Sequence, residues 1–184
     1  MPTPLKSICV FCGAAPGGQD QYVRHAHELG QMLADRGITL VYGGGGIGMM
    51  GAVADGALSR GGRITGVITR QLVDRELAHP AVADMRVVES MHERKMLMVG
   101  LADAFIALPG GYGTFDEFFE AVCWAQLEIH RKPIGLLNTR GFYNGLFSFL
   151  THAQSEGFLR LPLERAVTLG DSPRALLDAL DSPR

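Results

Sequence analysis

Short apolar runs alternate with segments of helical periodicity along the whole chain. The apolar runs, rich in β-branched and aromatic residues, predict buried strands at 7–12, 38–42, 64–68, 85–88, 104–108, 133–137 and 166–169. Apolar residues three and four positions apart predict helices at 20–36, 49–59, 141–156 and 173–180, with two more beginning near Ser90 and Thr114. Residues 71–84 have the least regular pattern, and we expect a loop or a short helix there.

This alternation is typical of β-α-β units, in which helices connect parallel strands. It predicts a single α/β domain over residues 1–184, built on one Rossmann-like, doubly wound parallel sheet with helices on both faces. In such sheets ligands bind beyond the carboxyl ends of the strands. Glycine-rich turns follow three predicted strands, after Cys12, Tyr42 and Leu108. We therefore expect a binding site near these turns.

Composition and charge narrow the classes of function. The chain has 184 residues, is 47% apolar and carries a net charge of −2. It lacks the basic excess that is common in nucleic-acid-binding proteins. Its apolar runs are shorter than the roughly 20 residues that a membrane helix needs. The first seven residues also lack the apolar segment of a secretion signal. We expect a cytoplasmic protein that binds neither nucleic acid nor membrane.

The cysteines and histidines do not form a recognisable metal or redox motif. Cys9 and Cys12 have CxxC spacing but fall within a predicted strand, where positions three apart face opposite sides. No second pair is present to complete a zinc site. His25 and His27 diverge on their helix, which disfavours a shared metal ion. We expect buried strand cysteines and no bound metal.

Residues 90–120 contain the strongest candidate site. A glycine-rich turn at 109–114 joins an apolar strand to a helix, an arrangement whose free N–H groups and helix dipole favour phosphate. Arg94 and Lys95 precede the strand, and Glu117 follows the turn. Each also has a structural interpretation. The cations could be solvated beside Glu93, and the Thr114-x-x-Glu117 pattern matches a capping box.

A second glycine motif, Gly46-Ile-Gly48-Met-Met-Gly51, has the GxGxxG spacing of dinucleotide-binding turns. It follows the second strand rather than the first, and the next strand ends without the acidic residue that binds a ribose. Three interpretations remain open. The turn could approach a phosphate or ribose of another ligand, bind a dinucleotide, or allow a helix to pack tightly on a strand.

The helix after residue 114 predicts a subunit contact. Phe118, Phe119, Val122 and Ile129 form one apolar face on a helical wheel, with Glu117, Glu120 and Trp124 roughly opposite. A solvated face should not carry Trp124 and Leu127. We expect a partner subunit to cover this second face, with Glu117 near its boundary.

At these residues the chain resembles the LONELY GUY (LOG) family of cytokinin-activating enzymes, which are often labelled "lysine decarboxylase-like". Met91-His-Glu-Arg94-Lys95 matches the family signature MHxRK, and Pro109 to Glu117 matches PGGxGTxxE. Further similarity lies at 9–13, 40–45, 124–126 and 132–137. The resemblance therefore covers most of the chain up to about residue 157.

The resemblance implies a Rossmann-like homodimer that hydrolyses cytokinin riboside 5′-monophosphates to the free base and ribose 5-phosphate, without metal or organic cofactor. Arg94 and Glu117 would be the catalytic pair. The implied substrate-binding residues are Glu76, Lys95, Gly111, Tyr112, Gly113, Thr114 and Cys123, with the 5′-phosphate held at 111–114. Cys123 replaces the Thr that is usual in plant members, which puts the preferred base in doubt.

Two alternative functions would use the same site. A general AMP or nucleoside 5′-monophosphate nucleosidase would share the chemistry and differ in its base pocket. A carrier related to molybdenum-cofactor-binding proteins would hold a phosphorylated ligand without cleaving it. A true lysine decarboxylase is disfavoured, because a pyridoxal enzyme needs a Schiff-base lysine and a large cofactor domain, and this chain has only Lys6, Lys95 and Lys132.

Overall fold

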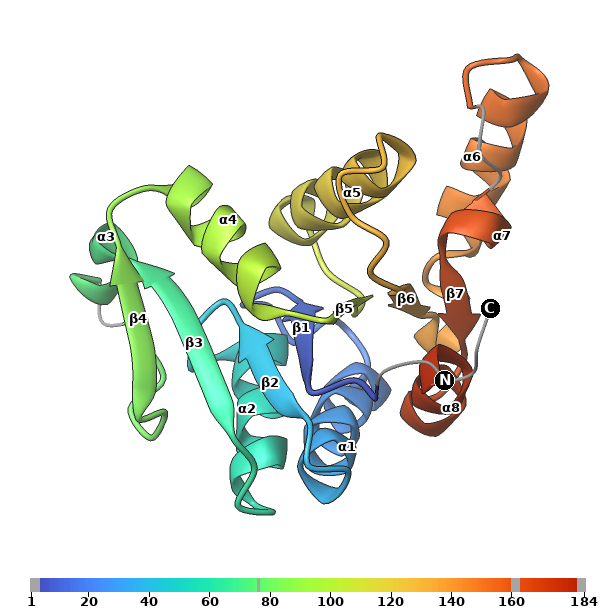
Figure 1. Cartoon of the computed structure of the whole chain (residues 1–184). Coiled ribbons are helices and arrows are strands. Elements are labelled where there is room, and N and C mark those ends of the chain that lie inside the picture. The colour runs from blue at the N-terminus through green and yellow to red at the C-terminus, as the bar shows by residue number, and fades with distance from the viewer. Residues whose placement is uncertain (1–3, 76, 160–162, 182–184) are drawn as a thin grey trace.

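The computed structural model describes residues 4–75, 77–159 and 163–181. Its centre is a seven-stranded sheet in the order β4-β3-β2-β1-β5-β6-β7 (Figure 1). All the strand pairs are parallel. The strands are β1 Ser7–Phe11, β2 Thr39–Tyr42, β3 Ile64–Thr69, β4 Asp84–Val88, β5 Ala104–Ala107, β6 Ile134–Leu137 and β7 Thr168–Gly170. The predicted parallel α/β sheet is confirmed.

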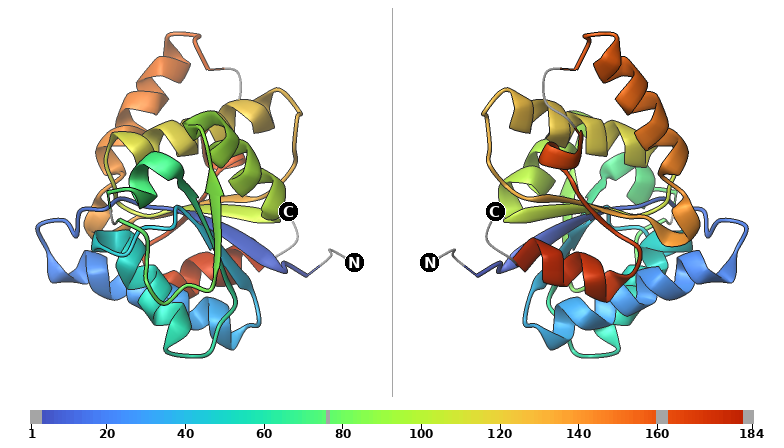
Figure 2. Two further views of the ribbon diagram at one scale, coloured as in Figure 1. Left: turned by 90° about the vertical axis from the view of Figure 1, so that its left-hand side faces the viewer. Right: turned by 90° about the vertical axis from the view of Figure 1, so that its right-hand side faces the viewer.

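Helices cover both faces of this sheet, as the two side views show (Figure 2). One face carries α1 Asp20–Asp35, α2 Gly48–Leu58 and α8 Pro173–Asp181. The other carries α4 Met91–Leu101, α5 Tyr112–Gln126 and α6 Asn144–Ser155. Three short helical segments complete the described fold: α3 Arg70–Val73, the 3₁₀ turn η1 Thr139–Gly141 and α7 Leu163–Ala166. The sheet is therefore doubly wound, as predicted.

The alternation of side chains along β1 divides the core into two apolar clusters. Ile8 and Val10 join the cluster beneath α1, α2 and α8. Cys9 and Phe11 join the cluster beneath α4, α5 and α6. Successive strand residues point to opposite faces, so Cys9 and Cys12 also lie in different clusters, each as a buried free thiol. The prediction of buried, unpaired cysteines is confirmed, although Cys12 lies one residue beyond β1.

The strand order reverses direction between β1 and β5. From β1 the chain adds β2, β3 and β4 on one side, and then crosses back through α4 to add β5, β6 and β7 on the other. The loops that leave neighbouring strands at such a point turn to opposite faces and open a crevice at the carboxyl edge of the sheet. The topology therefore brings the turn after β1 beside the turn after β5.

The sequence places most elements correctly, and the differences have local causes. The predicted capping box at Ser90 is present: Glu93 N–H donates to Ser90 Oγ at 3.1 Å, and Ser90 N–H donates to Glu93 Oε2 at 3.3 Å. Helix α6 begins later than predicted, because the preceding residues form η1 around Arg140, which has a φ of 57°. On α6, Leu150 is buried, whereas Phe149 is 64% exposed.

Two short features complete the description of residues 71–84. Helix α3 accounts for the predicted short helix. Beyond it, the chain pairs with the glycine turn after β2: Gly46 N–H donates to the Leu77 carbonyl, and His79 N–H donates to the Gly44 carbonyl. Within the described residues, no helix is both long enough and apolar enough to cross a membrane.

Helices α1 and α2 approach closely because each has a glycine at the contact. A Cβ added to Gly30 would collide with the Val53 carbonyl oxygen, and one added to Gly56 would collide with the His27 carbonyl oxygen. Both obstacles are backbone atoms of a packed helix, which cannot move aside as a flexible side chain can. This contact fixes α2, and hence the glycine turn that precedes it.

We predict that Gly30→Ala lowers the free energy of unfolding by about 1–3 kcal/mol, because the added methyl group forces the helices apart. Gly100→Ala is the matched control. Gly100 is also helical, but its Cβ would meet nothing within 4 Å, so that substitution should raise the free energy of unfolding by up to about 1 kcal/mol. Urea denaturation measures both values, and equal effects of the two substitutions would contradict the tight contact.

Candidate active site

A cavity of about 340 Å³ lies where the turns after β1 and β5 meet helices α4 and α5. It is therefore at the carboxyl edge of the sheet, beside the point where the strand order reverses. Its walls combine an apolar side, backbone-rich glycine turns and a group of charged side chains. The lining residues are Cys12, Gly13, Ala14, Ala15, Met50, Met91, Arg94, Gly111, Gly113, Thr114, Asp116 and Glu117.

A buried ion pair between Arg94 and Glu117 forms the charged centre of the cavity. Arg94 Nη1 donates to Glu117 Oε1 at 2.8 Å, and the two side chains are 8% and 9% exposed. Arg94 comes from the first turn of α4 and Glu117 from the second turn of α5, so the pair joins the two helices. The interpretation of Arg94 as a solvated surface cation is wrong.

The backbone around Arg94 is shaped to receive it. Arg94 Nε donates to the Val67 carbonyl of β3 at 2.9 Å. A Cβ at Gly43 would overlap with Arg94 Nη2, so only glycine leaves room for the guanidinium at the end of β2. Buried charges are tolerated when they are paired and hydrogen-bonded. The glycine turn after β2 thus accommodates the cation of the site.

The surroundings of Glu117 have two opposing effects on the pKa of its carboxyl group. Burial raises the pKa of Glu117 above the ordinary carboxyl value, while the charge and hydrogen bond of Arg94 oppose this shift. The carboxyl pKa remains raised because removal from water outweighs the attraction. A carboxyl group in a cavity with a perturbed pKa and a specific charged partner is a typical acid–base candidate.

Glu117 belongs to the inner face of α5, which corrects the predicted helical wheel. The buried residues of α5 are Thr114, Glu117, Phe118 and Ala121, spaced three and four apart. The helical wheel predicts Glu117 roughly opposite Phe118, and a charged residue is normally costly on a buried face. The pairing with Arg94 removes that objection. Glu117 therefore faces the cavity.

The start of α5 provides free hydrogen-bond donors. Its N-cap is Gly111, and no side chain caps the first turn. Thr114 and Glu117 both lie inside the helix, so the predicted Thr114-x-x-Glu117 capping box is wrong. The Thr114 hydroxyl is buried and has no hydrogen-bond partner among the described residues. A polar group buried without a partner is uncommon and indicates a position where a ligand oxygen fits.

Two hydrogen bonds hold the walls of the cavity. Tyr143 donates its hydroxyl to the Leu108 carbonyl at 2.6 Å, which fixes the end of β5 just before the glycine turn. Met50 N–H donates to the Gly13 carbonyl at 3.1 Å, which ties the start of α2 to the turn after β1. The two glycine turns therefore have defined positions relative to the sheet.

Lys95 lies beside the cavity but does not line it in this structure. Its Nζ is 3.1 Å from Asp116 Oδ2 and 3.2 Å from Glu120 Oε1, and its side chain is 16% exposed. Adjacent residues of a helix point in different directions, so Lys95 and Arg94 diverge. Arg94 points inward to Glu117, whereas Lys95 bridges α4 and α5 nearer the surface.

The other predicted substrate-binding residues fall into three groups. Gly111, Gly113 and Thr114 line the cavity. Tyr112 is 94% exposed and Cys123 is exposed, and neither lines the cavity. Glu76 lies outside the described residues. The structure thus brings the phosphate-type turn together with Arg94 and Glu117, and leaves the roles of Tyr112 and Cys123 as predictions.

Several lining residues were not identified from the sequence. Ala14, Ala15 and Met50 supply apolar surface, and Asp116 adds a carboxylate. The glycine-rich turn after Cys12 was recognised, but apolar and small residues in a turn carry no signal that they face a ligand. Met91, which also lines the cavity, begins the MHxRK signature and could have been found there.

In the structure the glycines of the GxGxxG motif pack closely against backbone, as one of the three interpretations expects, but against turns rather than a strand, and Met50 of the motif lines the cavity. Gly48 has a φ of 61°, and a Cβ there would collide with the Ala14 carbonyl; one at Gly51 would lie 2.6 Å from the Gly46 oxygen. These glycines therefore contact protein backbone, and none of them lines the cavity. Among the described residues, no cluster of three His, Cys, Asp or Glu side chains is suited to a metal ion.

Comparison with known proteins places this geometry in a family. A family model described as "Possible lysine decarboxylase" matches residues 50–180. The cytokinin riboside 5′-monophosphate phosphoribohydrolase LOG of Oryza sativa subsp. japonica is 48% identical over 177 residues, which are 96% of this chain and 73% of that relative. LOG7 of Arabidopsis thaliana, with the same activity in its name, is 46% identical over 96% of this chain and 82% of its own length.

Solved structures share the fold. The molybdenum cofactor binding protein of Rippkaea orientalis has a TM-score of 0.71 and 25% identity, over 98% of this chain and 96% of that one. The Moco carrier protein of Chlamydomonas reinhardtii has a TM-score of 0.71 and 22% identity, over 95% and 94% of the two chains. The second likeness is one of fold alone. Given the family model and the near full-length identity to the plant proteins, the chain belongs to the LOG family, to which the description "Possible lysine decarboxylase" is also applied.

Proposed function

We propose that this protein hydrolyses the N-glycosidic bond of cytokinin riboside 5′-monophosphates to give the free N6-substituted adenine and ribose 5-phosphate. The observation that carries the proposal is the buried Arg94–Glu117 pair, which lines a cavity beside an uncapped helix start. The names of the rice and Arabidopsis relatives supply the substrate. The reaction needs water and no organic cofactor or metal.

The first step of the proposed mechanism is binding of the 5′-phosphate at the start of α5. The free N–H groups of the first turn and the positive end of the helix dipole favour a dianion there. Gly111 and Gly113 allow close approach of the phosphate to the backbone, and the unpartnered Thr114 hydroxyl donates to a phosphate oxygen. This contact fixes the ribose relative to Glu117, which lies one turn further along α5.

Bond cleavage then develops positive charge on the ribose. The Glu117 carboxylate stabilises this oxocarbenium-like state and accepts a proton from the attacking water, as carboxylates do in glycosidases. The electron pair of the broken carbon–nitrogen bond leaves with the base, which gains a proton. Arg94 holds Glu117 in position through Nη1 and also binds substrate anion or assists departure of the base.

The buried ion pair also bears on the carrier hypothesis. The solved relatives include proteins named for molybdenum cofactor binding, so a ligand-holding role has a precedent in this fold. A carrier, however, does not require a buried carboxyl group in the same cavity as a phosphate-type turn. The pairing of Glu117 with Arg94 therefore favours hydrolysis.

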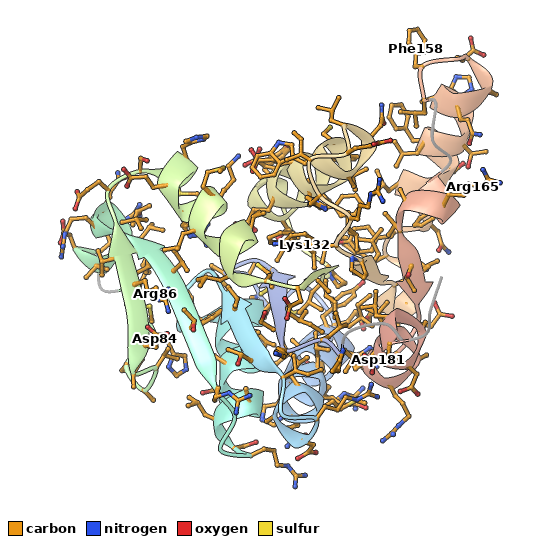
Figure 3. All side chains as sticks on the ribbon, in the orientation of Figure 1. Asp84, Arg86, Lys132, Phe158, Arg165 and Asp181 are labelled. Carbon is orange, nitrogen blue, oxygen red and sulfur yellow. The ribbon has the colours of Figure 1, made fainter. Side chains whose placement is uncertain are left out.

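A second copy of this chain is the proposed partner. Large apolar side chains remain exposed near the end of α5 and along α6: Leu127 is 67% exposed, Ile129 64% and Phe149 64%. Phe158, labelled in Figure 3, projects beyond the end of α6 and is 82% exposed. Exposed apolar groups of this size are more typical of a subunit contact than of a solvated surface.

We also propose a cytoplasmic location, since nucleoside monophosphates are charged and do not cross membranes freely. We propose no nucleic acid partner, because the chain has a net charge of −2 and no basic excess.

The direct test incubates the purified protein with isopentenyladenosine monophosphate and, separately, with AMP, and measures free base by chromatography. We expect isopentenyladenine to be released faster than adenine. Adenine released as fast or faster would identify a general nucleosidase. Release of neither base would identify a binding protein and contradict hydrolysis.

We predict that Glu117→Gln lowers kcat on the preferred monophosphate at least about 100-fold, because one charge-stabilising group is typically worth about 10²–10³ in rate. Glu93→Gln is the matched control, since Glu93 caps α4 and has no contact with the cavity; its kcat should stay close to that of the unmodified protein. Circular dichroism and thermal unfolding of both variants establish that they are folded. Near-normal turnover by Glu117→Gln would make Glu117 a structural residue.

We predict that the protein sediments as a dimer and that Leu127→Asp shifts it toward monomer, because a charge in the contact would lose its hydration. Asp35→Lys is the control, since Asp35 is an exposed residue at the end of α1, on the opposite face of the sheet. Sedimentation velocity at several concentrations measures the distribution. A dimer unaffected by Leu127→Asp would place the contact elsewhere.

A further inference from the structure

Lys95 has a position that differs from that of a phosphate ligand. Its ammonium group lies between Asp116 and Glu120 of α5, at 3.1 Å and 3.2 Å, and its side chain is largely buried against the two helices. An ammonium group has three N–H donors, and two of them are directed to these carboxylates. Lys95 does not line the cavity, whereas its partner Asp116 does.

The charges around the cavity show why this lysine matters. Arg94 and Lys95 are the two cations, while Asp116, Glu117 and Glu120 are three carboxylates. The group therefore carries a net negative charge even with Lys95 present. A phosphate monoester carries about −1.5 to −2 charges at pH 7. Without Lys95, two uncompensated carboxylates would stand next to the cavity that must admit this anion.

Lys95 is also aligned with the catalytic pair. It is adjacent to Arg94 in α4, and Asp116 is adjacent to Glu117 in α5, so both ion pairs join these two helices, which lie next to each other in Figure 1. Burial tends to lower the pKa of the Lys95 ammonium, but hydrogen bonds and charge from Asp116 and Glu120 raise its pKa overall. The bridge therefore stays charged throughout the neutral range.

We propose that Lys95 is a positioning residue that neutralises Asp116 and Glu120 at the rim of the cavity. A phosphate dianion can then bind in the cavity although Lys95 itself does not contact the phosphate. This inference rests on the proposed function, because it concerns the same anion site. It differs from direct phosphate binding by Lys95, in which the ammonium would leave its carboxylates to contact the substrate.

Charge neutralisation and direct phosphate binding by Lys95 predict opposite results for a variant that lacks Lys95 and both of its carboxylate partners. In Lys95→Met, we expect the Kd for ribose 5-phosphate and the KM for the monophosphate to rise about tenfold or more, because uncompensated like charge repels the anion, with a much smaller change in kcat. Adding Asp116→Asn and Glu120→Gln to Lys95→Met removes the repelling charges. This triple variant should then recover most of the lost affinity. Lys95→Arg keeps the bridge and should stay close to the unmodified protein.

Isothermal titration calorimetry with ribose 5-phosphate measures these affinities without turnover, at low and at raised salt. The loss in Lys95→Met should shrink as salt increases, since it is electrostatic. Thermal unfolding reports on folding; if Lys95→Met is unstable, Lys95→Gln takes its place. Recovery in the triple variant supports the proposal. An unchanged Kd in Lys95→Met, or a triple variant as weak as the single one, overturns it.

The calorimetry also separates this proposal from the proposed function. If the unmodified protein does not bind ribose 5-phosphate, the anion site and the role of Lys95 both fail. If it binds the sugar phosphate but releases no base from either monophosphate, hydrolysis fails while the role of Lys95 stands or falls on the variant series alone.

Discussion

The buried pairing of Arg94 with Glu117 is the interaction on which the site depends. Removing one partner of such a pair leaves a buried charge without compensation, typically at a cost of about 3–5 kcal/mol. The surrounding backbone is arranged accordingly: Val67 supplies a carbonyl to Arg94, and Gly43 has no side chain where the guanidinium lies. The ends of strands β2 and β3 thus accommodate the Arg94 guanidinium of α4, whose charge is balanced by Glu117 of α5.

This pairing explains why residues distant in sequence form one site. The crossover from β4 to β5 carries α4 over the sheet, and the turn after β5 starts α5 beside it. The reversal of strand order then opens the cavity between the turns after β1 and β5. Chemistry and topology coincide here, because the anion-binding helix start and the carboxyl group lie on one helix, one turn apart.

The sequence was informative where a residue's role follows from its neighbours along the chain. Alternating apolar runs predicted the parallel sheet, and the Ser90 capping box was correct because capping is local. Prediction from the sequence failed where one local pattern has two possible interpretations. The Thr114-x-x-Glu117 pattern resembles a cap, yet the helix begins at Tyr112, and Glu117 is buried because Arg94 meets it from another helix.

The sequence by itself therefore determined the doubly wound sheet, the glycine turns and the two family signatures, since period, turn chemistry and motif spacing are properties of contiguous residues. Only the tertiary structure decided that Arg94 is buried and Lys95 bridged to Asp116 and Glu120, that the GxGxxG glycines contact backbone, and that Ala14, Ala15 and Met50 form a wall. Most of these facts depend on contacts between residues distant in the sequence, such as Arg94 with Glu117 and Gly48 with Ala14, which the fold alone brings together.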